Sequence, residues 1–513
     1  TRQKSTHNSL CMFGILVSIP LIRRLIPSYA LPKQVISDVM DLQMNQSDSN
    51  RRRPPSIDSL LRKTDSYPIP RLLRKRLIQD LLRVWQQEHS LPDTDFIEAA
   101  IGSHLESIEK SHLQPVINAT GVVLHTNMGR APFHMDLCVH VNQSMIGYNS
   151  LELDLHTGKR GKRGALVEKA LAVLTGSESA TVVNNCASAL ILILSTCKLK
   201  DRREVLVSRS ELVQIGGGFR IPEILESAGL QLKEIGTTNR THINDYKKSI
   251  TDETALILKV HQSNFYMDGF VESASIKDLA ELAKSQQIPF AVDLGSGALI
   301  HTASHFGIEE EPTPESIVQK GADMVCFSGD KLMAGPQAGI IAGKETWIER
   351  LKSNPFFRAL RPDKMALSAL GFTVQKHLES KNDPESPKLP DLPAYELLSQ
   401  SRQNLKDRAD AILKASKCRS VHLNIIETDS EVGGGTMPRT RMASIAIEVN
   451  IQSIKPDTIA RSFRECHPPV IGYVQKGSFR LNLRTIFSDQ DETISACIQQ
   501  IEEKLVHRSS KEA

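Results

Sequence analysis

Between residues 180 and 329, short apolar runs rich in β-branched residues alternate with longer segments that have helical spacing. Such alternation predicts a mostly parallel sheet with helices on both faces. In a sheet of this kind, the catalytic and ligand-binding residues lie in loops at the carboxyl ends of the strands. We therefore expect an α/β fold, with strands in the runs "ATVVNN" (180–185), "EVLVS" (204–208), "ALILKV" (255–260), "IPFAVDLG" (288–295) and "DMVCFSG" (323–329).

The chain is longer than the size at which a single hydrophobic core stops growing, so several domains are expected. It has 513 residues, 40% of them hydrophobic and 24% charged, which excludes collagen-like and wholly disordered chains. A polar, proline-rich stretch at 379–395 is typical of a linker. The predicted parts are an unmatched extension, disordered or spurious (1–50), a basic helical domain (51–112), a large α/β domain (113–378), and a linker with a small C-terminal α/β domain (379–513).

One segment of the extension, "LCMFGILVSIPLI" (10–22), is apolar. It is shorter than the roughly 20 residues that a spanning helix needs, and it contains Gly14 and Pro20. A signal peptide is the alternative interpretation, although Arg23 and Arg24 interrupt the approach to a cleavage-like site. We therefore expect no membrane association.

Basic residues are interleaved with leucines at helical spacing in residues 51–83. Most basic amphipathic helices are solvated faces over an apolar core, but this local excess of cations also suits a nucleic-acid backbone. The net charge of the whole chain is only +4, so an anionic partner must be met by such a local cluster. No zinc-finger, RRM or KH signature accompanies the helices.

The eight cysteines include no CxxC pair and no finger-like spacing with histidine. This pattern argues against a structural metal site and against a secreted disulfide framework. We expect no metal and a reducing, cytoplasmic location.

A single lysine stands among small residues in "FSGDKLMAGPQAG" (327–339). A solvated lysine in a turn is one interpretation. The other is an amine that attacks a carbonyl carbon, which requires a cleared pocket. Asp293 ends an apolar strand 38 residues earlier, where a capping role is the ordinary alternative. Together the two residues match pyridoxal phosphate chemistry, with Lys331 forming the imine and Asp293 holding the pyridine nitrogen protonated.

The segment "VVNNCASALILIL" (182–194) passes from a strand through a short turn into a helix. Small residues open that helix, where backbone N–H groups and the helix dipole suit a phosphate. Ordinary capping by Asn184 or Asn185 is the alternative. The predicted cofactor-binding residues here are Asn185, Cys186, Ala187 and Ser188.

Three arginines stand near these motifs: Arg130 in "NMGRAP", and Arg358 and Arg361 in "FRALRPDK". Paired arginines usually form ion pairs at helix surfaces. If all three converged on a pocket, they would form a fork for a phosphate-like anion other than the cofactor's own phosphate. That arrangement predicts a second, anionic reactant.

The chain resembles the bacterial selenocysteine synthases, L-seryl-tRNA(Sec) selenium transferases, which are fold-type I pyridoxal phosphate enzymes. The resemblance covers roughly Arg53 to Val506. It departs at Met333, Ala334 and Tyr473 from the residues expected of the family. The motifs that carry it are "INATGVVLHTNMGRAP" (117–132), "YNSLELDLHTGKRGKR" (148–163), "SRSELVQIGGGFRIPEI" (208–224), "GTTNRTH" (236–242), "KVHQSNFYMDGFVE" (259–272), "VDLGSG" (292–297), "SGDKLMAGPQAG" (328–339) and "RALRPDK" (358–364).

The resemblance implies conversion of seryl-tRNA(Sec) to selenocysteinyl-tRNA(Sec) with selenophosphate. The seryl group would be dehydrated to an aminoacrylyl intermediate, with Lys331 taking the Cα proton, before selenium is added. It further implies that the N-terminal domain grips the tRNA and that the subunits form a homo-oligomeric ring of dimers, a homodecamer. The residues it implies in catalysis are Lys331, Asp330, Arg130, Arg358 and Arg361.

His125 and His261 also lie in these motifs and are candidates to flank the cofactor, His261 as a cofactor-binding residue, although a lone histidine is more often structural.

Two other functions are alternatives to this one. One is a related pyridoxal enzyme acting on a small amino acid or an amino sugar phosphate, which would not need the basic helices. The other is a tRNA-binding scaffold with a decayed site, which the intact lysine, aspartate and arginines disfavour.

Overall fold

The computed structural model describes residues 54–87, 92–215, 218–381 and 388–512. The predicted extension, 1–50, lies outside the described residues. Two compact units divide at Pro115 and Val116, and each is described by itself below. The predicted domain limits stay predictions. Among the described residues, no helix combines the length and the apolar character needed to cross a membrane.

The first unit contains α3 (Ile57–Lys63), α4 (Arg71–Gln87) and α5 (Thr94–Lys110). Side chains cap the N-termini of two of these helices. Ser56 accepts a hydrogen bond from the Ser59 amide at 3.2 Å, and Asp93 accepts one from the Phe96 amide at 2.8 Å. The leucines that recur at helical spacing in the sequence pack together into one small core. That core includes Leu60, Leu61, Ile78, Leu82, Ile101 and Leu105.

A seven-stranded sheet organises the second unit, in the order β3-β13-β12-β11-β9-β4-β7. Strand β13 runs antiparallel to both neighbours, and the other pairings are parallel. The prediction of a mostly parallel α/β sheet is therefore confirmed. The strands are β3 (Ser179–Val183), β4 (Glu204–Ser208), β7 (Gln231–Ile235), β9 (Thr254–Val260), β11 (Phe290–Gly295), β12 (Met324–Ser328) and β13 (Gly339–Gly343).

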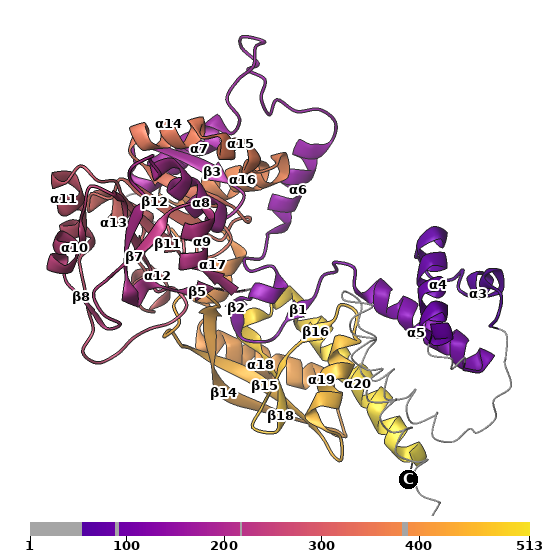
Figure 1. The fold of residues 1–513 in the computed structure, drawn as a ribbon. Helices are drawn as coiled ribbons and strands as arrows, with labels where there is room; N and C mark the ends of the chain where they lie inside the picture. The colour runs from indigo at the N-terminus through magenta and orange to yellow at the C-terminus, as the bar shows by residue number, and fades with distance from the viewer. Residues whose placement is uncertain (1–53, 88–91, 216–217, 382–387, 513) are drawn as a thin grey trace, which may run out of the picture. The chain divides into compact units, whose positions relative to one another are not determined.

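Helices cover both faces of this sheet (Figure 1). Alternate residues of each strand point to opposite faces, so Val182 packs into one apolar cluster and Val183 into the other. The first cluster includes residues of α7 (Ala165–Thr175), α10 (Ile243–Ser249), α11 (Ile276–Ser285), α13 (Pro314–Gln319) and α16 (Lys364–Ser380). The second includes residues of α8 (Cys186–Cys197), α9 (Ile221–Ser227) and α14 (Glu345–Ser353). Further helices are α6 (Met135–Met145), α12 (Thr302–Phe306) and α15 (Pro355–Ala359).

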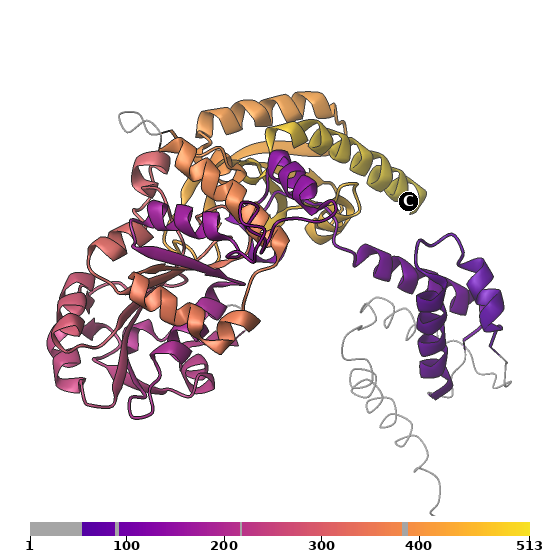
Figure 2. The same ribbon diagram turned by 90° about the horizontal axis from the view of Figure 1, so that it is seen from above.

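The C-terminal part of this unit contains a five-stranded sheet in the order β17-β18-β15-β14-β2 (Figure 1). Its members are β2 (Val122–Leu124), β14 (Val421–Gly433), β15 (Met442–Ile451), β17 (Tyr473–Gln475) and β18 (Ser478–Asn482). Strand β1 (Ile117–Asn118) pairs with β16 (Val470–Ile471). The helices of this part are α17 (Pro393–Ser399), α18 (Arg402–Ser416), α19 (Pro456–Arg464) and α20 (Asp491–Glu512). Two long helices of this part, α18 in orange and α20 in yellow, lie side by side in Figure 2.

Strands β1 and β2 precede the large sheet in the sequence but pair with strands from the end of the chain. The loop after β2, which carries Arg130, and the loop after β14, which carries Gly435, therefore start from neighbouring strands. Both loops contact the segment that holds Lys331. The smaller sheet thus helps to build the site at the edge of the larger one.

Candidate active site

Lys331 follows β12 at the carboxyl edge of the large sheet and is buried, with 5% of its surface exposed. Its Nζ donates a hydrogen bond to the backbone oxygen of Gly435 at 3.1 Å. Burial lowers the pKa of this amine, because removal from water disfavours the charged form, and the cationic Arg130 lowers it further. The acidic groups Asp293 and Asp330 oppose this shift. The solvated-lysine interpretation is therefore wrong.

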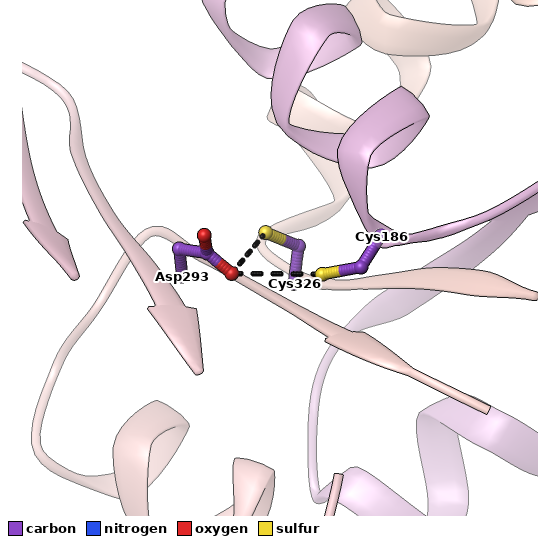
Figure 3. A group of neighbouring side chains, drawn as sticks. All are labelled: Cys186, Asp293 and Cys326. Carbon is purple, nitrogen blue, oxygen red and sulfur yellow. Dashed lines mark hydrogen bonds between the residues drawn. The ribbon is translucent and has the colours of Figure 1, made fainter. Parts of the chain in front are cut away.

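Asp293 lies in β11, beside Cys326 of β12 in the register of the parallel pair. Its Oδ1 accepts hydrogen bonds from the Cys186 thiol at 3.5 Å and from the Cys326 thiol at 3.7 Å (Figure 3). Burial raises the pKa of the Asp293 carboxyl, and the thiol donors and the nearby Lys331 offset part of that rise. The buried Asp293 carboxyl group lines the same pocket as Lys331 and is available to a ligand bound there.

Helix α8 begins directly beside Asp293. The Asn185 side chain caps it by accepting a hydrogen bond from the Ser188 amide at 2.8 Å. The first amides of a helix have no acceptor within the helix, so those of Cys186 and Ala187 can meet an anion. Gly339 allows this turn to approach β13, because a Cβ there would lie 2.1 Å from the Asn185 backbone oxygen. Capping by Asn185 and anion binding are thus compatible.

These groups line one pocket of about 250 Å³. Among the predicted residues, Ser188 only donates to the cap and is not in the lining. The pocket is lined by Arg130, Asn185, Cys186, Ala187, Leu190, Val260, His261, Ser263, Asp293, Leu294, Gly295, Ser328, Asp330, Lys331 and Gln337.

A larger hollow of about 660 Å³ lies elsewhere on the same sheet. Its lining includes Pro289 and Asp323, which directly precede β11 and β12, and Lys344, which follows the antiparallel β13. It therefore lies at the amino edge of the parallel strands. Because ligands of open α/β sheets bind at the carboxyl edge, the smaller pocket is the better candidate.

Arg130 joins the pocket through an ion pair. Its Nη1 donates to Asp330 Oδ2 at 2.7 Å, and the Ala131 amide donates to the Asp330 backbone oxygen at 3.3 Å. The Arg130 backbone has a left-handed φ of 64°. A bulky residue in that conformation is uncommon, which indicates that the surrounding contacts hold the loop in place.

Arg358 and Arg361 do not line the pocket. Arg358 is exposed at the end of α15, whereas Arg361 Nη1 donates to Glu152 Oε1 at 3.2 Å. Glu152 also lies within ion-pair distance of Arg160, at 2.8 Å, and of Arg163, at 3.9 Å. The structure therefore brings only Arg130 of the three predicted arginines to the pocket, and their convergence stays a prediction.

The two histidines differ in position. His261 lines the pocket, and its Nδ1 lies 3.5 Å from Oε1 of the buried Glu311. Burial raises the pKa of the Glu311 carboxyl. His125 does not line the pocket and accepts a hydrogen bond from the Asn127 amide at 3.2 Å. This hydrogen bond caps the turn that leads to Arg130, and burial lowers the pKa of His125, which favours the neutral ring that can accept it.

The pocket suits pyridoxal phosphate by the chemistry of its donors. A buried amine is available for the aldehyde, a buried carboxyl group for the pyridine nitrogen, and the start of α8 for the phosphate. Gly295 and Gly435 leave space around the amine, since a Cβ at either position would lie 4.0 Å or 3.3 Å from Lys331 Nζ. The residues present therefore fit the cofactor.

Sequence reasoning missed several residues of the site. Gly435 lies in "EVGGGTM" (431–437), a glycine run that could have signalled a close backbone approach. Cys326 gave no signal, because its proximity to Asp293 depends on the strand register. Glu311 and Glu152 also gave none, since their partners lie far along the chain.

Comparisons with known proteins agree with this geometry. A family model described as L-seryl-tRNA selenium transferase matches residues 116–487. The chain is 37% identical to the L-seryl-tRNA(Sec) selenium transferase of Geobacter sulfurreducens, over 88% of this chain and 98% of the relative. It is 40% identical to that of Aquifex aeolicus, over 77% and 86%, and 43% identical to that of Carboxydothermus hydrogenoformans, over 78% and 84%.

Solved structures also resemble the chain. One of them is that of D-glucosaminate-6-phosphate ammonia-lyase, with a TM-score of 0.53 and 21% sequence identity, covering 78% of this chain and 98% of that one. At this level of identity the likeness concerns the fold.

Proposed function

The chain belongs to the L-seryl-tRNA selenium transferase family, and we propose that the pocket around Lys331 holds pyridoxal phosphate and carries out the family's reaction. The fold is that of fold-type I pyridoxal phosphate enzymes. The activity of the family is the conversion of L-seryl-tRNA(Sec) to L-selenocysteinyl-tRNA(Sec), a step of selenocysteine biosynthesis. The substrates are accordingly the charged tRNA and a selenium donor, for which we propose selenophosphate.

The observation that carries the cofactor proposal is the placement of Lys331 and Asp293 in one buried pocket beside the start of α8. Lys331 would hold the cofactor covalently, and Asp293 would hold its pyridine nitrogen. Asn185, Cys186, Ala187 and His261 would surround it, while Ser188 would support the site through its hydrogen bond to the Asn185 cap. When bound, pyridoxal phosphate supplies an electron sink for charge that develops at the substrate's α-carbon.

The residues of the chain have separate tasks in this proposal. The lowered pKa of Lys331 increases the fraction of neutral amine, which can take the proton from the seryl α-carbon. Asp330 orients Arg130 through their ion pair. The buried setting excludes bulk water and strengthens the effect of each charge on the reacting atoms.

We also propose that Arg130, Arg358 and Arg361 bind selenophosphate, because guanidinium groups match oxyanions in charge and geometry. Arg130 is already in the pocket, while Arg361 is paired with Glu152. The ring of dimers, a homodecamer, and the cytoplasmic location remain part of this proposal. The seven described cysteines form no disulfide with one another.

For the tRNA, we propose the helical first unit as a binding surface. Arg62 and Lys75 are exposed and have no ion-pair partner among its described residues. Lys110 at the end of α5 is likewise exposed and has no ion-pair partner among these residues, whereas the remaining described arginines and lysines of the unit are partly neutralised. The pairs are Lys63 with Glu98, Arg71 with Asp58, Arg74 with Asp65, and Arg76 and Arg83 with Asp80. Because these pairs reduce the local excess of charge, we assign the backbone contacts first to Arg62 and Lys75.

The test is the absorbance spectrum of the purified protein with pyridoxal phosphate, before and after addition of seryl-tRNA(Sec). We expect a visible band that Lys331→Ala abolishes and that the charged tRNA shifts. Lys344→Ala, at the amino edge of the same sheet, is the matched control and should keep the band.

Two other outcomes would contradict the proposal. A band that ignores the charged tRNA but responds to small amino compounds would indicate a pyridoxal enzyme of another specificity. No band in the wild-type protein would leave a tRNA-binding scaffold.

A further inference from the structure

We propose that Cys186 and Cys326 are positioning residues that fix the carboxyl group of Asp293 through two thiol hydrogen bonds, so that its second oxygen is presented to the cofactor's pyridine nitrogen. This inference rests on the proposed function, because it concerns the carboxyl group that would meet the cofactor. It assigns a task to two thiol groups: the proposed function uses the backbone amide of Cys186 but neither its thiol nor Cys326.

The geometry of the three side chains carries the proposal. Both thiols donate to the same atom, Asp293 Oδ1, at 3.5 Å and 3.7 Å, and they come from two different elements, the first turn of α8 and strand β12 (Figure 3). No protein group among the described residues donates to Oδ2. Two donors on one oxygen restrict rotation of the carboxylate plane, which leaves the other oxygen for a partner in the pocket.

Because Asp293 is buried, even the weak thiol donors affect the charge state of its carboxyl group. Asp293 and Cys326 are 7% and 1% exposed, so water cannot readily replace a lost thiol donor. An unpaired carboxylate in such a place is costly, and its proton affinity rises. The thiol bonds act in the opposite direction and lower the pKa of Asp293. The other titratable groups that act on this carboxyl are Lys331 and His261, which also favour its charged form.

The same three donor atoms lie within 4.8 Å of one another, a spacing that a metal ion could also use. A metal would need the thiolate form of the cysteines. The neighbouring Cys186, burial and the Asp293 carboxylate instead raise the pKa of Cys326, which keeps it protonated. The Cys326 thiol is therefore better suited to donate a hydrogen bond to Asp293 than to bind a cation.

The experiment measures the dissociation constant of pyridoxal phosphate and the pH dependence of its absorbance band in the full-length protein. The variants are Cys186→Ala, Cys186→Ser, Cys326→Ala and Cys326→Ser. Cys197→Ala is the matched control, since Cys197 is a buried cysteine of the same helix α8 but does not contact Asp293.

We expect each alanine variant to bind the cofactor about three- to tenfold more weakly, the loss expected for one weak bond to a charged acceptor. The band should also respond to pH over a shifted range, because Asp293 then holds its proton more tightly. Each serine variant keeps a donor and should recover most of the affinity. Cys197→Ala should match the wild type in both measurements.

Alanine variants that match the wild type, or serine variants that are as weak as the alanine variants, would overturn the proposal. If Cys326→Ala does not fold, as shown by the thermal unfolding of the apoprotein, the half-buried Cys186 decides the question alone. A wild-type protein without any band attached to Lys331 would instead overturn the proposed function. The two failures are therefore distinguishable.

Discussion

Asp330 Oδ2 accepts a hydrogen bond from Arg130 Nη1 at 2.7 Å, across 200 positions of sequence. The side chain of Asp330 is 9% exposed and that of Arg130 is 28% exposed, so the pair is partly shielded from water. The pair joins the loop after β2 to the residue directly before Lys331. A mutation of either partner therefore changes both the position of a loop and the charge beside the lysine.

The first prediction concerns the pKa of Lys331. Asp330 raises this pKa and Arg130 lowers it, so Asp330→Asn should lower the pKa and Arg130→Met should raise it. The pH dependence of Lys331 acylation in the apoprotein, followed by peptide mass spectrometry, measures both shifts. Lys344 serves as the internal reference, and equal pKa values for Lys331 in the two variants would refute this account of the pair.

A second prediction uses two glycines with nearly the same backbone. Gly435 has a φ of 79° and Gly477 a φ of 78°, but only at Gly435 would a Cβ approach Lys331 Nζ, at 3.3 Å. Alanine at either site should cost about 1 kcal/mol of unfolding free energy, because L-residues are strained there. Only Gly435→Ala should also impair cofactor attachment. Calorimetry and the absorbance band separate the effects, and equal attachment in both variants would contradict the predicted crowding.

A third prediction is a pH dependence of stability from His377. This side chain is buried behind the lysine loop, with Nε2 2.9 Å from the Met333 backbone oxygen, and burial lowers its pKa from 6.5 to about 4. The unfolded chain therefore binds a proton at a higher pH than the folded chain. The stabilisation is complete above pH 6.5 and falls as the pH decreases towards about 4, by about 3 kcal/mol in all.

The matched variant is His377→Gln, which keeps an amide donor for the Met333 oxygen but does not titrate. Denaturant unfolding at a series of pH values should show a steeper loss of stability below pH 6.5 for the wild type than for the variant. Parallel pH profiles would show that His377 does not contribute this dependence.

The fourth prediction concerns Glu152, which pairs with Arg361 at 3.2 Å and with Arg160 at 2.8 Å. If Arg361 binds an oxyanion, this carboxylate competes with it. Glu152→Gln should then tighten the binding of inorganic phosphate or thiophosphate severalfold, as measured by calorimetry at low salt. Arg361→Met in the same background should remove the gain. Unchanged or weaker binding in Glu152→Gln would contradict the competition.

The last prediction tests the helical unit. Arg62→Glu combined with Lys75→Glu should weaken tRNA binding about tenfold or more at moderate salt and reduce the slope of log affinity against log salt by roughly 1 to 2. Arg71→Glu with Arg83→Glu is the comparison, because both of these arginines already have acidic partners. A larger loss in the comparison variant would place the tRNA surface elsewhere.

Much of the fold was predictable, because it depends on local patterns. The runs that form β4, β9, β11 and β12 are apolar and β-branched, and the prediction that they form strands of a parallel sheet is confirmed. The pairing of β2 with β14 was not predictable, since it joins segments about 300 residues apart with no local signal. The antiparallel direction of β13 was also unexpected.

The sequence by itself determined the chemical groups of the site and their order. Lys331 after one strand, Asp293 at the end of another and small residues at the start of a helix were sufficient to predict the cofactor, because strand ends of a parallel sheet meet at one edge. The motifs were likewise sufficient for the family.

Only the tertiary structure decided the hydrogen-bond partners and the pKa shifts of these groups. The carbonyl of Gly435 beside Lys331, the thiols of Cys186 and Cys326 on Asp293, and Glu152 on Arg361 all depend on contacts between distant segments. Such contacts follow from strand register and from the packing of two sheets, which a sequence pattern of period 2 or 3.6 does not specify. Burial, which shifts the pKa of both Lys331 and Asp293, is likewise a property of the assembled fold.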